Sequence, residues 1–471
     1  MAEKMIIELR EIIAKQVVII EEQKAEIEQL KTEIKSLKEQ LKQNSTNSSK
    51  PPSSDGFKKQ TSLKKKGGKV GGQDGHKGYG MKIDKEPDKI VELKSERCDN
   101  CGADLIFCDS EFITHRYVYE VVIKSILIEY QQFKTVCGSC ETSNFGEFPK
   151  NVNGTKQYGE SVAALAALLT NYAMVGIDKT AKIMRDVLCV PISTGTIDNI
   201  NKRFSKSKIT GDISAKIKDV LSLSKVVHFD ETGLRVDGKN HWLHTSSNAD
   251  VTYNTVHKKR GKTGIDNNGI INEFAGVAVH DCMKTYFGYD NCEHALCCAH
   301  LLRELNASIE NDGFQWAADM KKLLLDMKRK KEKYIELEKS KLSSHLHRKY
   351  DKEYERIIAL GNDETPYNIA SRKQSKARNL LDRFISYKAE VCRFANDFDV
   401  PFDNNQAERD IRFVKVKQKV SGGFRSEYGA DNFAISSSVI GTAVKQKKSV
   451  FYTVKDIFLG VNSLFAIGAT E

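Results

Sequence analysis

The sequence predicts a multidomain protein of the α+β class. Three observations support this prediction: a seven-residue apolar repeat at the start of the chain, two Cys-x-x-Cys pairs, and short apolar strands that alternate with helices in the second half. The chain has 471 residues, which at roughly 150 residues per domain favours two to four domains. Its 40% hydrophobic and 29% charged residues exclude the disordered and fibrous classes.

The charge balance favours an anionic partner. Lys and Arg number 74 against 63 Asp and Glu, which gives a net charge of +11, and such an excess suits nucleic acid. The most apolar stretch, residues 162–177, contains Thr170, Asn171 and Tyr172 and is shorter than the roughly 20 residues of a membrane span. Charged residues near the N-terminus argue against a signal peptide. We therefore expect a cytoplasmic protein without a membrane partner.

Residues 1–43 are predicted to form a coiled-coil zipper. Apolar residues recur at every seventh position, at Ile6, Ile13, Ile20, Ile27, Ile34 and Leu41. Three residues after the first five of these lie Leu9, Gln16, Gln23, Leu30 and Leu37. This pattern favours a parallel coiled coil, so we expect a homo-oligomer that is at least a dimer. The alternative, an amphipathic helix packed on its own chain, predicts a wider apolar stripe.

Residues 44–88 are predicted to be a flexible basic linker. Ser, Asn and Pro dominate residues 44–54, whereas lysines and glycines dominate residues 57–85. Such a run is often only solvated surface, but beside a DNA-binding module it neutralises phosphates without reading sequence. The lysines expected to contact DNA are Lys64, Lys65 and Lys66.

Residues 89–150 are predicted to form a four-cysteine, zinc ribbon-like module. Each Cys-x-x-Cys turn lets two thiolates face one tetrahedral Zn²⁺, and four sulfurs make a closed structural site. The odd total of 11 cysteines favours metal ligation over a disulfide framework. Residues 114–136, rich in β-branched and aromatic types, are expected to form the intervening strands. The expected zinc ligands are Cys98, Cys101, Cys137 and Cys140.

Residues 151–220 are predicted to be a helical DNA-binding region. A helix over 177–187, a turn at 189–191 and a second helix capped by Ser193 or Thr194 form a helix-turn-helix pattern. An ordinary pair of helices is the alternative, because the sequence does not show which face is exposed. The side chains of types that reach bases or phosphates are Thr196, Asn199, Asn201, Lys202 and Arg203.

Residues 221–445 are predicted to contain a sheet of mixed direction. A short apolar strand over 225–229 leads to Asp230, and a second strand over 276–280 leads to Asp281. Both acids are therefore expected at strand ends.

Further elements complete this predicted domain. The alternation over residues 241–257 indicates a hairpin at an antiparallel edge. A highly charged helical insertion over about residues 306–395 is expected to be a hairpin of helices outside the sheet. A later helix carries the third acid, Glu408, and residues 446–471 form a helical tail.

Carboxylates in these positions suit a two-metal site. Two acids on neighbouring strands and one on a later helix can hold two Mg²⁺ or Mn²⁺ ions, which activate a water and stabilise the leaving oxygen of a phosphodiester. Spacing alone does not single them out, because 63 acidic residues offer many such triples. The other acids considered are Glu231, Asp237, Asp290, Glu304, Asp403 and Asp410.

Several blocks of this sequence resemble one known family. They are His228-Phe-Asp230-Glu-Thr232, Asp281 ahead of Cys297-Cys-Ala-His300, and Asp403-Asn-Asn-Gln-Ala-Glu408-Arg409. In order and approximate spacing they are similar to those of the large transposase of the insertion-sequence sixty-six family, as are the heptads, linker and cysteine pairs. The resemblance implies a ribonuclease-H-like catalytic domain with Asp230, Asp281 and Glu408 as a DDE triad that holds Mg²⁺ or Mn²⁺.

The resemblance also implies an activity and partners. Such an enzyme binds the terminal inverted repeats of its element, cuts them, joins the ends to target DNA and works with helper proteins of the same element. Two alternatives are a non-catalytic, zinc-containing DNA-binding protein derived from a transposase, and a stand-alone nuclease of the same fold.

The chain departs from the family pattern in two places. The second acid is usually followed by Gly-Tyr, whereas here Cys282 and Met283 follow Asp281, and Cys298 stands where tryptophan is common. Cys297 and His300 are kept, and a Cys-x-x-His pair can bind metal. With only two clear ligands, we favour a buried thiol and a hydrogen-bonded imidazole.

Overall fold

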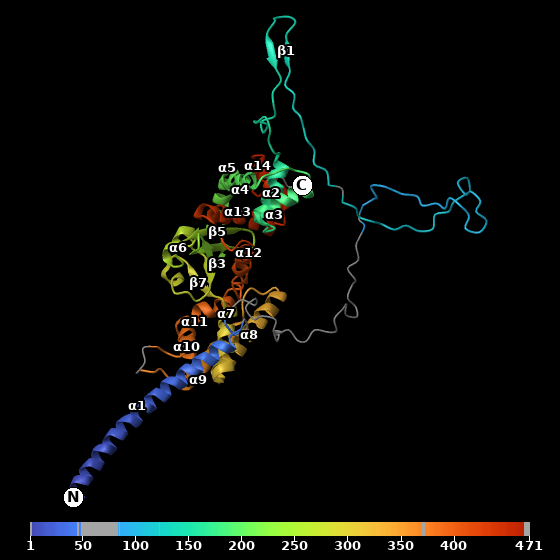
Figure 1. Cartoon of the computed structure of the whole chain (residues 1–471). Helices are drawn as coiled ribbons and strands as arrows, with labels where there is room; N and C mark the ends of the chain where they lie inside the picture. Colours follow the sequence, from blue (N-terminus) through green and yellow to red (C-terminus); the bar gives the residue numbers. More distant parts are fainter. Residues whose placement is uncertain are drawn as a thin grey trace. The chain divides into compact units, whose positions relative to one another are not determined.

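The computed structural model describes residues 2–44, 47–48, 83, 85–121, 123–369 and 373–465. These residues belong to two compact units, one of residues 57–128 and one of Met1–Gly56 with Glu129–Glu471. Figure 1 shows the element order from helix α1 to helix α14. The predicted DNA contacts Lys64, Lys65 and Lys66 lie outside the described residues. None of the described helices has both the length and the apolar character that crossing a membrane requires.

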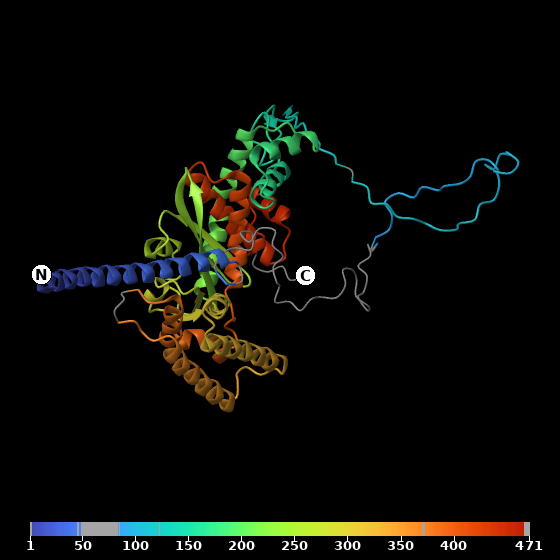
Figure 2. The same cartoon turned by 60° about the horizontal axis from the view of Figure 1, so that its bottom comes forward.

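The zipper segment is one long helix, α1 (Ala2–Lys42) (Figure 2). Its described seam side chains are not covered by the rest of the chain: Ile20 and Ile27 remain 49% and 50% exposed. An ion pair between Glu39 and Lys376 joins the end of α1 to the folded part. The seam is therefore available to another helix.

The two cysteine turns share one backbone geometry. In the first, the N–H of Cys98 donates to the carbonyl of Ala103, and the N–H of Gly102 donates to the carbonyl of Cys98. Gly102 adopts the left-handed conformation at φ 70°, which glycine does without a steric penalty. The turn therefore folds back on itself within six residues, and the thiols of Cys98 and Cys101 both belong to it.

The second turn repeats this pattern. The N–H of Cys137 donates to the carbonyl of Thr142, and the N–H of Glu141, at φ 58°, donates to the carbonyl of Cys137. The antiparallel strands β1 (Lys134–Val136) and β2 (Ser143–Phe145) flank it. Within the described residues, β1 is the one strand of the expected region 114–136, so the other strands predicted there are not formed.

A helical layer follows the cysteine turns. Its members are α2 (Glu160–Asn171), α3 (Ile177–Asp186), α4 (Thr194–Lys206) and α5 (Lys208–Ser222). Of the two expected caps, Ser193 is the one formed: its hydroxyl accepts the N–H of Thr196 at the start of α4. Buried residues of this layer share one hydrophobic core with α13 (Glu427–Lys445) and α14 (Val450–Phe458).

The central sheet has five strands in the order β5-β4-β3-β6-β7. They are β3 (Val226–Val236), β4 (Lys239–Ser247), β5 (Thr252–His257), β6 (Val277–His280) and β7 (Glu293–Leu296). β4 pairs antiparallel with both β3 and β5, as the predicted edge hairpin requires. β6 pairs parallel with both β3 and β7. This mixed sheet is consistent with a ribonuclease-H-like domain. Two short elements connect its strands, α6 (Lys262–Asn268) and the 3₁₀ turn η2 (Tyr286–Gly288).

The place of Asp230 differs from the prediction. β3 continues to Val236, so Asp230 lies inside the strand rather than at its end. The antiparallel ladder with β4 continues from His228 to Val236. The prediction ended the strand at Phe229 because the apolar run ends there. Asp281 does follow directly after β6.

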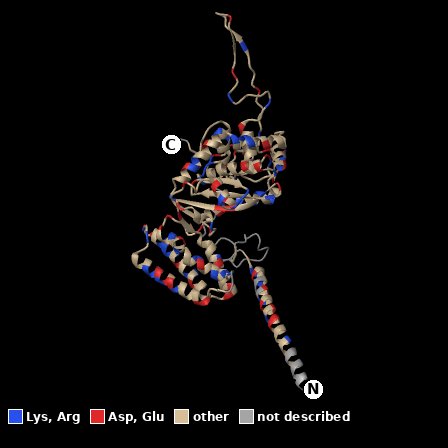
Figure 3. Cartoon of the chain, turned by 90° about the vertical axis from the view of Figure 1, so that its left-hand side faces the viewer, with Lys and Arg blue, Asp and Glu red and all other residues tan. Residues whose placement is uncertain are grey.

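The insertion is larger than the predicted hairpin. Between β7 and α12 (Asn405–Ser421), the described residues form five helices, which are α7 (Cys298–Asp312), α8 (Gln315–Glu336), α9 (Ser344–Glu364), α10 (Lys376–Ser386) and α11 (Lys388–Asn396). Trp316 and Phe384 are fully buried in a core that includes Val279 of the sheet, so the helices also cover one sheet face. Basic and acidic residues are mixed along these helices (Figure 3).

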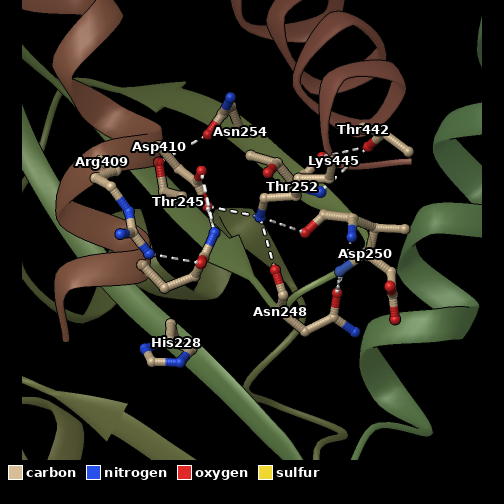
Figure 4. A network of polar contacts seen from close by, with 12 residues as sticks. His228, Thr245, Asn248, Asp250, Thr252, Asn254, Arg409, Asp410, Thr442 and Lys445 are labelled. Carbon is tan, nitrogen blue, oxygen red and sulfur yellow. Dashed lines mark hydrogen bonds and ion pairs between the residues drawn. The ribbon is translucent and has the colours of Figure 1, made fainter. Parts of the chain in front are cut away.

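Two sets of polar contacts anchor the first turns of helix α12. Near its start, Nδ1 of His228 donates to the side-chain oxygen of Asn404 over 2.8 Å, and Asn404 donates to the carbonyl of Phe229 over 2.8 Å. Further along, Lys445 of α13 pairs with Asp410 at 2.7 Å (Figure 4). α12 therefore cannot move along β3 without breaking buried polar contacts.

Lys445 also ties the β4–β5 turn to these helices. Its ammonium donates to the carbonyls of Asn248 and Val251, over 2.7 and 2.9 Å. Burial lowers the pKa of Lys445, and the charge of Asp410 opposes this shift. The ion pair is thus partly desolvated and has several hydrogen bonds that compensate for the lost water.

Gly276, which has no Cβ atom, permits the close approach of the start of β6 to the start of β3. A Cβ atom at this position would lie 2.5 Å from the carbonyl oxygen of Lys225 and 2.7 Å from that of Ser224. We expect Gly276→Ala to lower the free energy of unfolding by about 1–3 kcal/mol, because the backbone has to shift. Urea denaturation measures this loss. Gly288→Ala is the matched control, since nothing lies within 4 Å of its added Cβ, and equal losses in both variants would contradict the prediction.

Lys445→Met should destabilise the chain by about 3–5 kcal/mol, because it leaves the partly buried Asp410 carboxylate without its cation. Thermal and urea unfolding measure the effect. The matched control is Lys202→Met, which removes an exposed pair with Asp198 and should change stability little, because water screens exposed pairs. A loss for Lys445→Met as small as that of the control would show that the pair does not anchor α12.

Candidate active site

The sheet register places Asp230 beside Asp281. In the parallel pairing of β3 with β6, His228 lies opposite Val279. Two residues further along both segments, the same register brings Asp230 next to Asp281. The position of β6 relative to β3 therefore brings together two acids that are 51 residues apart in the sequence.

The charges of the three predicted catalytic acids interact at this place. Burial raises the pKa of the Asp230 carboxyl well above its ordinary value, and the negative charges of Glu231, Asp281 and Glu408 raise it further. The N–H of Glu231 donates to Oδ1 of Asp230 and opposes this shift. Asp281 keeps 28% of its side chain exposed and accepts the N–H of Met283. The cluster thus carries a surplus of negative charge.

Glu231 has a different environment from Asp230. Its Oε1 accepts from Nε and Nη2 of Arg260 over 2.8 and 2.7 Å, and its Oε2 accepts the hydroxyl of Tyr286 over 2.9 Å. Both oxygens therefore have protein partners, and the side chain is 1% exposed. Arg260 also reaches Asp281, with 4.0 Å between Nη2 and Oδ2.

Glu408 enters the cluster from the first turn of α12. Its Oε1 lies 3.7 Å from Nδ1 of His300 and 3.7 Å from Nη2 of Arg303. That oxygen is buried and makes no hydrogen bond within the described part of the chain, and the same holds for Nδ1 of His300. Burial, and secondly the charge of Arg303, lower the pKa of His300. The imidazole expected to be hydrogen-bonded therefore lacks a partner at Nδ1.

Cys297 completes this side of the site. Its side chain is buried, as expected, and Sγ accepts the N–H of Asn404 over 3.1 Å. Burial raises the pKa of this thiol to about 12. Within the described residues, one set of three possible metal-ligand atoms was found, those of Cys297, His300 and Glu408, which all lie within 4.8 Å of one another. The sequence shows the first two as a Cys-x-x-His pair but gives no sign of the third.

Several other acids have structural partners. Glu304 pairs with Arg383, and Asp410 pairs with Lys445. Oδ1 of Asp403 accepts the N–H of Asn405 where α12 begins. The remaining two are Asp237, which occupies the left-handed turn after β3, and Asp290, which is exposed.

The predicted DNA-contacting side chains of α4 differ in exposure. Asn199 and Arg203 are exposed, and Arg203 lies over the Phe458 ring. Lys202 pairs with Asp198, and Thr196 hydrogen-bonds to the capping Ser193. A further residue of this set faces inward, since the side-chain oxygen of Asn201 accepts from Thr170 and Asn171. Asn199 and Arg203 are thus the most accessible of the set.

The four predicted zinc ligands belong to separate units of the structure. Cys98 and Cys101 lie in the unit of residues 57–128, and Cys137 and Cys140 lie in the other unit. All four have free thiols. The cysteine turns themselves suit a metal, because both share the tight backbone geometry described above. A shared zinc site stays a prediction.

Sequence reasoning missed the residues that support the acids. Arg260 and Tyr286, which hold Glu231, lie in no recognisable motif. Asn404 is within the block around Glu408, and His228 is within the block around Asp230, but their mutual contact is long-range.

Comparison with known proteins identifies the family. The model of the transposase IS66 family matches residues 155–432, a range that includes Asp230, Asp281 and Glu408. The model of a family of unknown function, DUF6444, matches residues 2–82. A search of curated proteins found no match. Because the transposase model covers more than half of the chain, from the helical layer through the sheet to α13, this chain belongs to the IS66 family of transposases.

Proposed function

We propose that this chain is a DDE-type DNA transposase. In this proposal it binds the terminal inverted repeats of an insertion sequence and catalyses metal-dependent DNA cleavage and strand transfer. The observation that carries the proposal is the β3–β6 register, which brings Asp230 next to Asp281. Burial raises the pKa of Asp230, and the charges of Glu231, Asp281 and Glu408 raise it further, so Glu408 belongs to the same cluster. The mixed sheet and the family match support a ribonuclease-H-like catalytic domain.

The three acids fit divalent cations. Carboxylate oxygens are the ligands that Mg²⁺ and Mn²⁺ prefer. Arg260 pairs with Glu231 and lies 4.0 Å from Asp281, and Arg303 lies 3.7 Å from Glu408. These two arginines do not balance the four carboxylates of Asp230, Glu231, Asp281 and Glu408, so the cluster keeps a surplus of negative charge. When bound there, such ions activate a water and stabilise the leaving oxygen of a phosphodiester.

Each acid is held by a different part of the fold. Asp230 lies in β3 and Asp281 directly follows the neighbouring strand β6. Glu408 extends from a helix that Asn404 and Lys445 fix to neighbouring elements. This arrangement keeps the three carboxylates in place without substrate. Such preorganisation favours in-line attack on a bound phosphodiester.

In this proposal the remaining modules bind DNA, zinc and a second copy of the chain. Asn199 and Arg203 of α4 reach the element ends, while Lys64, Lys65 and Lys66 neutralise phosphates. The cysteines hold one structural Zn²⁺, and α1 forms a coiled coil with a second copy. The proposal also includes helper proteins of the same element, target DNA and action in the bacterial cytoplasm, which the likeness to the family supports.

Substitution of the acids tests the proposed chemistry. Asp230→Asn, Asp281→Asn and Glu408→Gln should each lower cleavage and strand transfer by about 10³-fold or more, because each removes a charge that holds the ions. Purified protein with Mg²⁺ or Mn²⁺ and labelled element ends gives the measurement. DNA binding should persist. The exposed Asp290→Asn is the matched control and should retain near-normal rates.

The same assay separates the alternatives. A DNA-binding protein without catalytic activity binds the ends and leaves them intact, whereas a stand-alone nuclease cuts without joining. Full strand transfer by all three variants would rule out the DDE mechanism.

Cys98→Ser should reduce bound zinc by one ion per chain, because a structural site needs all four thiolates. Metal analysis of purified protein measures this change. Cys108→Ser is the control, since Cys108 is an exposed thiol outside both pairs. Undiminished zinc in Cys98→Ser would contradict the predicted module.

Deleting residues 1–43 should lower the oligomeric state, because the zipper seam is lost. Light scattering gives the mass. Within the full chain, Ile27→Asp should weaken association by placing a charge in the seam, whereas Glu28→Ala, one residue further on the same helix, should not. An unchanged mass in both the deletion and Ile27→Asp would refute the coiled coil.

A further inference from the structure

Three different kinds of ligand atom converge where α7 begins. The thiol of Cys297, the imidazole of His300 and a carboxylate oxygen of Glu408 all lie within 4.8 Å of one another. Cys297 is the N-cap residue of α7 and His300 lies in the first turn of that helix, while Glu408 comes from α12. The helix packing thus supplies the third ligand that the Cys-x-x-His pair lacks in the sequence.

We propose that Cys297, His300 and Glu408 form a second metal site, which takes Zn²⁺ and competes with the catalytic ions for Glu408. One sulfur, one nitrogen and one oxygen ligand suit Zn²⁺, whereas Mg²⁺ prefers oxygen ligands alone. Three protein ligands leave the fourth tetrahedral position open to water or a DNA oxygen. Binding converts the Cys297 thiol to a thiolate and releases its proton to solvent.

The surroundings of the three side chains support this assignment. Nδ1 of His300 and Oε1 of Glu408 are buried and make no hydrogen bond within the described residues, although they lie 3.7 Å apart. Two ligand atoms are therefore desolvated and close together. Arg303 lies 3.7 Å from the same Glu408 oxygen but makes no hydrogen bond to it, so a cation bound by both atoms would lower the free energy of the site.

The sulfur of Cys297 already accepts a hydrogen bond from a residue outside the three ligands. The backbone N–H of Asn404 donates to Sγ of Cys297 over 3.1 Å. A hydrogen bond of this kind stabilises a metal-bound thiolate and orients it. Asn404 is itself fixed by His228 and by the carbonyl of Phe229, so the sulfur is held in place before an ion arrives.

The competition for Glu408 rests on the proposed function. If Glu408 helps to hold the catalytic ions, a Zn²⁺ ion that also takes Cys297 and His300 withdraws Glu408 from that role. Zn²⁺ would therefore inhibit a reaction that depends on Mg²⁺. Binding of Zn²⁺ itself needs no catalytic activity, so the two claims are measured separately.

Metal stoichiometry tests the site directly. The full chain is loaded with Zn²⁺, dialysed and analysed for metal, and the measurement is repeated for Cys297→Ser and His300→Gln. We expect each variant to hold one ion fewer than the wild type, whatever the four-cysteine module binds. With Co²⁺ in place of Zn²⁺, the thiolate charge-transfer absorption should decrease in Cys297→Ser.

Two comparisons make the result specific. Cys298→Ser changes the adjacent, fully buried cysteine, which is outside the cluster, and should keep the ion. His300→Gln alters a side chain that is 28% exposed, so folding should tolerate it, and Zn²⁺ affinity should still fall by at least about 100-fold. Equal zinc content in the wild type, Cys297→Ser and His300→Gln would overturn the proposal, as would loss of the ion from Cys298→Ser.

A cleavage assay then tests the competition. At fixed Mg²⁺, added Zn²⁺ should inhibit the wild type, and Cys297→Ser should need at least about tenfold more Zn²⁺ for the same fractional inhibition, each protein being compared with its own zinc-free rate. Equal sensitivity would overturn the competition. Absence of cleavage under all conditions, with zinc content as expected, would refute the proposed function and leave the zinc site supported.

Discussion

The anchoring of Asn404 is the contact on which the candidate site depends. This buried amide accepts from His228, donates to the carbonyl of Phe229, and offers its backbone N–H to Cys297. It thereby joins β3, the segment before α7, and the start of α12, the three places that carry Asp230, Cys297 and Glu408. Because each buried polar group here has a partner, moving α12 would leave several of them unsatisfied. Glu408, one helical turn after Asn404, is positioned as a consequence.

The second constraint is electrostatic. Glu231 and Asp230 are adjacent in sequence, but alternate residues of a strand point to opposite faces, and the two carboxylates meet different neighbours. Arg260 and Tyr286 hold Glu231, whereas burial raises the pKa of Asp230 and the charges of Glu231, Asp281 and Glu408 raise it further. The fold keeps this repulsion because the sheet and the anchored α12 hold the acids in place. A cluster of this kind is stabilised when cations bind.

Glu408 belongs to two groups of candidate ligands. Its charge acts on Asp230 together with that of Asp281, and its carboxylate lies with the thiol of Cys297 and the imidazole of His300. The first group suits hard cations and the second suits Zn²⁺. The insertion contributes to this arrangement directly, since its first helix, α7, carries His300 and Arg303 and packs on the sheet through buried apolar residues.

The sequence by itself determined the local elements and their order. Heptad spacing predicted α1, a cap at Ser193 or Thr194 predicted the start of α4, and the alternation over residues 241–257 predicted the β4–β5 hairpin. Each of these patterns reflects contacts within a turn or a strand pair. Family blocks indicated the acids. Only the tertiary structure decided that β3 extends past Asp230, that Glu231 is held by Arg260, and that Glu408 joins Cys297 and His300. These outcomes depend on strand register and helix packing between residues far apart in the chain, which no local pattern encodes.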